Sequence, residues 1–190
     1  QALAHAMTPE QAQRLGLVAI LLIGETVLPG TREFLSGRLG AKSIAVYSCQ
    51  EVGFMATQCP LAPHYHVMAE NVLVEILRDD GTAAAPSEAG QVVVTGFYNY
   101  AMPFIRYALG DVATAGPLSC ACGRTLPVIA EIDGRTRHAF VFRDGTRVWP
   151  RPFLLDFTPF VSCRAYQLAQ IDHERIEFRY IPAEAAAPPD

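Results

Sequence analysis

The sequence predicts an α/β (mixed α+β) fold, and two observations lead to that prediction. An apolar run at residues 17–23, a helical pattern at 31–39 and a second apolar run at 43–47 follow one another near the amino end. This order favours two parallel strands joined by a right-handed helical crossover. After Gly53, short β-type segments alternate with turns rich in Gly, Asp and Pro, which is typical of a sheet built from short strands.

The first element is a short helix with a clear start signal. Thr8 suits the N-cap, Pro9 the first helical position and Gln11 the capping-box position. The helix should run to about Leu15, where Gly16 ends it.

The strand–helix–strand unit comes next. The seven apolar residues 17–23 predict a buried strand, because a short continuous apolar run fits a strand covered on both faces. A turn at 24–30 leads into the helix at 31–39, which Gly40 is placed to terminate. Residues 43–47 form the second strand.

The remaining elements are mostly β-type. The sequence predicts strands at 66–67, 71–78, 91–96 and 112–115, a turn at 79–81, a flexible loop at 82–89 and a boundary at 132–135. It then predicts a hairpin of 139–142 with 146–149, a helical piece near 153–158, a hairpin of 165–170 with 176–181, and disorder over 182–190.

The bulk composition excludes some function classes. The 190 residues are 51% hydrophobic and carry a net charge of −4 without a basic stripe, so we expect no nucleic-acid partner. No apolar run reaches the roughly 18 residues of a membrane span. The five cysteines are an odd number and the amino end lacks signal-peptide features. We therefore expect no disulfide framework and a cytoplasmic location.

The most informative stretch runs from Phe97 to Asp111. It is aromatic and apolar and ends on a single acidic residue. A buried carboxylate needs a partner, and a vicinal diol such as a ribose can donate two hydroxyls to it. The alternative is a loop Asp that makes a turn or capping contact.

Three ordered motifs connect this stretch with a known family. They are Tyr-Asn-Tyr-Ala-Met-Pro-Phe-Ile-Arg-Tyr-x-x-Gly-Asp at 98–111, Cys-Ala-Cys-Gly-Arg-Thr-Leu-Pro at 120–127 and Ile-Asp-Gly-Arg at 132–135. With them, the chain resembles the adenylate-forming ligases, in particular the phenylacetate–coenzyme A ligase branch with its coenzyme F390 synthetase-like proteins. The resemblance extends from about residue 17 to about residue 149.

The resemblance implies a domain organisation. Residues 1–133 would be the C-terminal part of a large nucleotide-binding domain, with the βαβ unit and a small β-barrel-like region. Residues 134–138 would be a hinge, and 139–190 would begin a small α+β domain. The family's phosphate loop and its late catalytic Lys have no counterpart, since Lys42 is the only lysine. The chain therefore looks like a fragment of a larger enzyme.

The resemblance also implies residues that bind ATP or AMP. Gly24 and Glu25 match a turn along the adenine, although an ordinary strand–helix turn is equally compatible. Tyr47 matches a Tyr that stacks on adenine, and Glu51 a Glu that helps hold Mg²⁺. Gln50 stands where relatives have a hydroxyl residue that touches the α-phosphate, so that contact is a departure from the pattern.

Two further residues are implied by the resemblance. Asp111 matches the residue that binds the ribose hydroxyls. Arg135 matches an Arg that approaches the ribose or phosphate, and a guanidinium suits such an oxygen-rich partner. Relatives continue with an acidic hinge, whereas this chain has Arg137 and His138.

The cysteines indicate a metal site. Cys120 and Cys122 form a compact thiolate pair, and Cys59 precedes a His-x-His pair, His64 and His66. Three Cys and one His make a normal tetrahedral shell for structural Zn²⁺. The position of a His in relatives favours His66 over His64. The alternative is a set of reduced thiols beside two surface histidines.

The resulting hypothesis is an ATP-dependent ligase that converts a carboxylic acid, with an aromatic acid favoured, into acyl-AMP and then acyl-CoA. Its partners would be a small-molecule carboxylic acid, the nucleotide and coenzyme A, and this chain alone would lack turnover. The alternative is a non-catalytic, zinc-stapled nucleotide-binding or interaction module. A third reading has an amine, hydroxyl or phosphate acceptor in place of coenzyme A.

Overall fold

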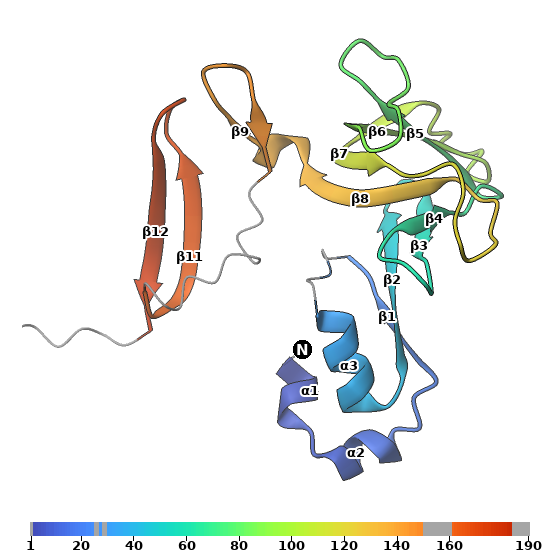
Figure 1. The fold of residues 1–190 in the computed structure, drawn as a ribbon, viewed down its shortest axis with the longest axis vertical. Coiled ribbons are helices and arrows are strands. Elements are labelled where there is room, and N and C mark those ends of the chain that lie inside the picture. The colour runs from blue at the N-terminus through green and yellow to red at the C-terminus, as the bar shows by residue number, and fades with distance from the viewer. Residues whose placement is uncertain (1, 25–26, 28–29, 150–160, 184–190) are drawn as a thin grey trace, which may run out of the picture. The chain divides into compact units, whose positions relative to one another are not determined.

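The computed structural model describes residues 2–24, 27, 30–149 and 161–183 (Figure 1). Its contacts divide the chain into two compact units, Gln1–Thr136 and Arg137–Asp190. The assignment of these parts to the two domains of a ligase, with a hinge at 134–138, stays a prediction.

The amino-terminal helices follow their sequence signals. Helix α1 covers Ala2–Ala6 and helix α2 covers Pro9–Arg14. The amide of Gln11 donates to Thr8 Oγ1 over 3.2 Å, and the amide of Thr8 donates to Gln11 Oε1 over 2.8 Å. The predicted capping box is therefore confirmed.

The strand–helix–strand unit is also confirmed. Strand β1 (Ala19–Leu22) pairs in parallel with β2 (Lys42–Cys49), and helix α3 (Thr31–Leu39) lies between them in the chain (Figure 1). The helix ends at Gly40, whose φ of 66° suits a left-handed cap and whose amide donates to Ser36 O.

The expected burial of the first strand is wrong for this chain. Leu21 in β1 is 59% exposed, and Ile23 directly after it is exposed as well. The cause is position, because β1 is the edge of its sheet and pairs only with β2.

One eight-stranded sheet forms most of the first unit, in the order β1-β2-β3-β4-β8-β7-β6-β5. Its remaining strands are β3 (Gly53–Gln58), β4 (Tyr65–Val67), β5 (Val72–Leu77), β6 (Ala89–Gly96), β7 (Tyr107–Ala115) and β8 (Val128–Arg135), and all their pairings are antiparallel. The mixed α+β fold class is confirmed.

Three parts of this sheet were not predicted. Strand β3 was missed, β7 begins five residues earlier than expected, and β8 extends through the residues read as a boundary. Gly110 explains the error in β7, because its φ of 77° is unusual inside a strand and a glycine there resembles a turn signal.

The core of this unit lies among strands β2 to β8. Its buried members are mostly aliphatic: Tyr47, Met55, Ala56, Val67, Val72, Val92, Val94, Leu109, Ala113 and Ile129. These residues come from strands far apart in sequence, so the core depends on the whole sheet.

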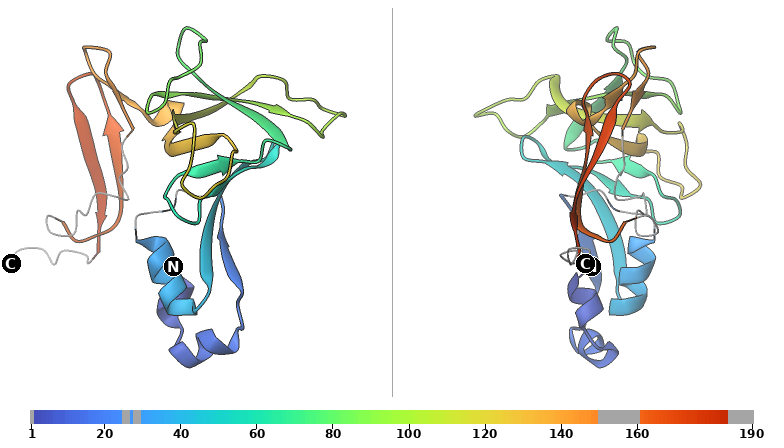
Figure 2. Two further views of the ribbon diagram at one scale, coloured as in Figure 1. Left: turned by 45° about the vertical axis from the view of Figure 1, so that its right-hand side comes forward. Right: turned by 90° about the vertical axis from the view of Figure 1, so that its left-hand side faces the viewer.

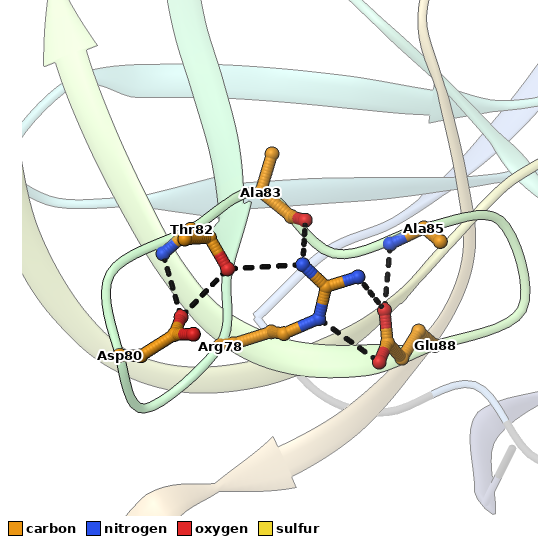
Figure 3. Close-up of polar contacts among 6 residues, drawn as sticks. All are labelled: Arg78, Asp80, Thr82, Ala83, Ala85 and Glu88. Atoms are coloured by element: carbon orange, nitrogen blue, oxygen red, sulfur yellow. Dashed lines mark hydrogen bonds and ion pairs between the residues drawn. The ribbon is translucent and has the colours of Figure 1, made fainter.

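The loop at 82–89 was predicted to be flexible, but side-chain bonds fasten it (Figure 3). Arg78 forms a two-point ion pair with Glu88, at 3.0 and 2.5 Å, and donates to Thr82 Oγ1 and Ala83 O. Glu88 also accepts from the amide of Ala85. A bidentate Arg–carboxylate pair fixes geometry better than a single contact, so Arg78 holds both sides of the loop.

The second unit contains the two predicted hairpins (Figure 2). A 3₁₀ turn (Thr136–His138) leads to β9 (Phe140–Val141) and β10 (Arg147–Val148), and β11 (Cys163–Gln170) pairs with β12 (Ile176–Pro182). The side chain of Gln170 joins the hairpins, because it donates to Val141 O and accepts from Val141 N, each over 2.8 Å.

Two further predictions concern segments that lie wholly or partly outside the described residues. The helical piece at 153–158 lies outside the described residues. Disorder was predicted from residue 182, but Pro182 belongs to β12, and residues 184–190 lie outside the described part. Among the helices that the structure describes, none has the length and apolar character to cross a bilayer.

Met55 is the largest fully buried side chain, and its truncation tests the core. Met55→Ala should lower the free energy of unfolding by about 2–5 kcal/mol, because it leaves a cavity that the sheet cannot close. Urea unfolding followed by circular dichroism measures the change. Met102→Ala is the control, since Met102 is 62% exposed and should shift the midpoint little; equal effects would contradict this core.

Candidate nucleotide and metal sites

The first candidate site centres on the carboxylate of Asp111, which is only 7% exposed. The hydroxyl of Tyr47 donates to its Oδ2 over 2.6 Å. Arg135 Nε lies 2.9 Å from its Oδ1, and Arg135 Nη1 donates to Leu109 O. Each carboxylate oxygen therefore has one partner from another strand.

Strand register explains this grouping. Asp111 on β7 is the cross-strand partner of Arg135 at the end of β8, and directly paired residues share a face of the sheet. Tyr47 lies on β2 and belongs to the core. Burial raises the pKa of Tyr47 well above its usual range, and the charge and hydrogen bond of Asp111 raise it further. Tyr47 therefore stays a neutral donor.

The Asp111 carboxylate is suited to a ligand that carries hydroxyl groups. A carboxylate has about four lone-pair positions, so two donors leave Asp111 further capacity to accept. Tyr47 as a residue is 8% exposed, and the stacking of its ring on adenine stays a prediction. What the structure shows is that Tyr47 holds Asp111, a role that sequence reasoning missed.

The other residues predicted to contact the nucleotide follow strands β1 and β2 in the chain. Gly24 follows β1 with a φ of 87°, while Glu25 lies outside the described residues. Gln50 is exposed in the turn after β2. Glu51, in the same turn, lines a cavity of about 400 Å³ together with Phe104 and others. The roles of these residues stay predictions.

The second candidate site is a cluster of Cys59, His66, Cys120 and Cys122, whose ligand atoms all lie within 4.8 Å of one another. Cys59 Sγ lies 3.7 Å from Cys120 Sγ, and Cys122 Sγ lies 3.2 Å from His66 Nε2. His64 Nε2 lies 3.1 Å from Cys120 Sγ but is not one of the four mutually close residues.

Strand pairing builds this cluster as well. His66 on β4 is the partner of Val128 on β8, and the loop before β8 carries Cys120 and Cys122. Cys59 directly follows β3, which pairs with β4. Residues nearly sixty positions apart in sequence therefore meet at one end of the sheet.

The geometry of the cluster fits a zinc ion, and so do the pKa shifts of Cys122 and His66. Two sulfurs at 2.3 Å from a tetrahedral ion would be about 3.8 Å apart, close to the separation of Cys59 and Cys120. The backbone amide of Arg124, together with hydrogen bonds from Cys120, Cys59 and the Arg124 side chain, lowers the pKa of Cys122 to about 7. The Cys122 amide lowers the pKa of Cys120, but burial and the Cys122 and Cys59 thiols outweigh it and raise that pKa, so Cys120 would lose its proton when metal binds. Burial lowers the pKa of His66. Thiolate and neutral imidazole are the forms that bind metal.

One of the two sequence comparisons found a relative of the kind that the motifs indicate. No protein-family model matches the chain. A phenylacetate–coenzyme A ligase of Thermus thermophilus is 28% identical over 150 residues, which are 77% of this chain. The chain spans 33% of that relative's length.

Similarity to solved structures covers a larger share of this chain than the sequence match does. A 2-hydroxyisobutyryl-CoA ligase in complex with an acyl-AMP gives a TM-score of 0.71 at 20% identity, covering 91% of this chain and 39% of that one. The chain has the fold of an adenylate-forming ligase. The O-succinylbenzoate coenzyme A synthetase of Bacillus subtilis with AMP (TM-score 0.66, 14% identity, 98% and 40% covered) and an anthranilate CoA ligase (0.64, 14%, 98% and 38%) agree. The resemblance expected from the sequence is confirmed.

Removal of the Tyr47 hydroxyl tests its bond to the buried Asp111. Tyr47→Phe should lower the free energy of unfolding by about 1–3 kcal/mol, because it leaves a buried carboxylate oxygen without its donor. Chemical denaturation measures the loss. Tyr100→Phe removes the same atom from a side chain that is 84% exposed and should change little; equal losses would refute the structural role of Tyr47.

Metal content tests the cluster. The purified chain should hold one Zn²⁺, measured by mass spectrometry of metals, and Cys120→Ser or Cys122→Ser should lose it. Cys49→Ser and Cys163→Ser are matched controls. Because Cys122 must lose its proton, zinc affinity should fall as pH drops from about 8 to about 6. A pH-independent affinity, or equal zinc in all four variants, would contradict this cluster.

Proposed function

We propose that the chain forms the nucleotide-binding, carboxy-proximal part of an ATP-dependent ligase that makes acyl-adenylates. The observation that carries the proposal is the Tyr47–Asp111–Arg135 group around the buried Asp111. The resemblance places Asp111 and Arg135 at the ribose and Tyr47 at the adenine. Asp111 would accept from the ribose hydroxyls, and Arg135 would approach the ribose or the α-phosphate.

Positioning is the main contribution that such a site makes to catalysis. Tyr47 and Arg135 hold the Asp111 carboxylate before the nucleotide arrives, so little reorganisation is needed on binding. Gly24 and Glu25 would border the adenine and Gln50 would donate its amide to the phosphate. Glu51 would help hold Mg²⁺, a cation that prefers oxygen ligands and that would neutralise phosphate charge.

The whole protein would activate a carboxylic acid, with an aromatic acid favoured, and pass the acyl group to coenzyme A. The structural relatives named above support this reaction class, since two of them are CoA ligases in complex with the AMP adduct of their acid. An amine acceptor has separate support, because an amide bond synthetase also shares the fold at a TM-score of 0.61. A cytoplasmic location is also part of the proposal, and it is supported by cysteines that form no disulfide with one another.

Structural zinc is part of the proposal. Cys59, His66, Cys120 and Cys122 would complete a closed Cys₃His shell without a position for substrate. His64 would then donate to the Cys120 sulfur from outside that shell, as partners of metal ligands commonly do. The non-catalytic, zinc-stapled module remains the second candidate function, and the same four residues favour it.

AMP titration by calorimetry tests the nucleotide site. The chain should bind AMP saturably, and Asp111→Asn should weaken binding at least tenfold, because hydrogen bonds to a charged group are worth about 1.5–3 kcal/mol each. Asp111→Ala should abolish binding. Glu10→Gln, which removes an exposed carboxylate from α2, should bind like the unmodified chain.

The outcomes separate the two candidate functions. Thermal unfolding of each variant shows whether it is folded. A folded chain that holds zinc but does not bind AMP would favour the module and refute the nucleotide site. Equal AMP affinity in folded Asp111→Asn and the unmodified chain would refute the role of Asp111.

A further inference from the structure

Two tyrosine–acid segments in the first unit pair reciprocally. Tyr47 stands four residues before Glu51, and Tyr107 stands four residues before Asp111. Tyr47 donates to Asp111 of the other segment over 2.6 Å. Tyr107 in turn donates its hydroxyl to Glu51 Oε1 of the first segment over 3.4 Å. Each segment thus supplies one hydroxyl and one carboxylate to the other.

We propose that Tyr107 is a positioning residue that orients the carboxylate of Glu51 toward a divalent cation. The inference rests on the proposed function, in which Glu51 helps hold Mg²⁺. Tyr107 would act on Glu51 as Tyr47 acts on Asp111, so that one bond prepares the ribose contact and the other, longer and more exposed, prepares the cation contact.

Two features restrain Tyr107, a contact of its ring and the fixed backbone of the residue before it. Its ring packs edge-on against Phe104, with centroids 5.0 Å apart. The preceding Arg106 has a φ of 45°, which is costly for a residue with a side chain. Two contacts hold that conformation, since the Arg106 amide donates to Thr95 Oγ1 over 2.9 Å and its Nε lies 3.2 Å from Glu75 Oε2.

Glu51 needs such a partner more than Asp111 does. It is half-buried in a turn and lines the cavity of about 400 Å³, so its side chain borders open space. Ordering a Glu side chain on binding costs rotamer entropy, and a hydroxyl already directed at Oε1 reduces that cost. The present 3.4 Å separation is long, but such bonds commonly tighten when the ligand completes the site.

The test measures cation binding with Mn²⁺ as the probe in place of Mg²⁺. Free Mn²⁺ is followed by electron paramagnetic resonance while the chain is held saturated with AMP. Tyr107→Phe should weaken Mn²⁺ affinity about tenfold, the lower end of the effect of losing a partner of a metal ligand. Glu51→Gln should weaken it further. Tyr100→Phe, in the same aromatic stretch, is the matched control and should match the unmodified chain.

A metal-free AMP titration of each variant separates positioning from damage to the fold. In Tyr107→Phe, the loss should be larger for Mn²⁺ than for metal-free AMP; equal losses would overturn the positioning role. An unchanged Mn²⁺ affinity, with AMP still bound, would also overturn it while leaving the proposed function intact. Absence of AMP binding by the unmodified chain would refute the proposed function and the inference with it.

Discussion

The buried carboxylate of Asp111 is the constraint around which the first unit is arranged. Asp111 is only 7% exposed, and an unpaired carboxylate buried to that degree would destabilise the fold by more than one apolar contact stabilises it. The chain therefore has to bring a donor to each oxygen, and it takes Tyr47 from β2 and Arg135 from β8. Both are distant from Asp111 in sequence, so the charge is satisfied only when β2, β7 and β8 are all in their native places.

The sequence predicted what local chemistry determines. The capping box at Thr8 and the glycine that ends α3 follow from signals within a few residues, and the parallel β1–β2 pair follows from the order of three neighbouring elements. The structure has each of them. Among site residues, the grouping of Cys59, His66, Cys120 and Cys122 was also anticipated, because three thiols and an imidazole make a normal zinc shell and the resemblance favoured His66 over His64.

What the sequence did not predict depends on long-range pairing. Residues 132–135 were predicted to be a boundary, but their pairing with β7 makes them the end of strand β8. The burial of β1 was overestimated, because an apolar run indicates that a strand would be stable when covered but not whether another element covers it. The Tyr47–Asp111 bond spans 64 positions, and no local signal indicates which carboxylate a buried tyrosine will find.

Strand β8 joins the two candidate sites physically. Its first residue, Val128, pairs with His66 of the metal cluster, and its last, Arg135, pairs with Asp111. The seven steps between them span about 24 Å of strand. A metal that binds the folded cluster better than the unfolded chain adds stability by mass action. It would thereby favour the β4–β8 register, and through the same strand the register that holds Arg135 opposite Asp111. On this reasoning a zinc ion at the cluster and a nucleotide at Asp111 would not bind independently, because a slip of β8 by one residue would turn its side chains to the other face and separate both pairs.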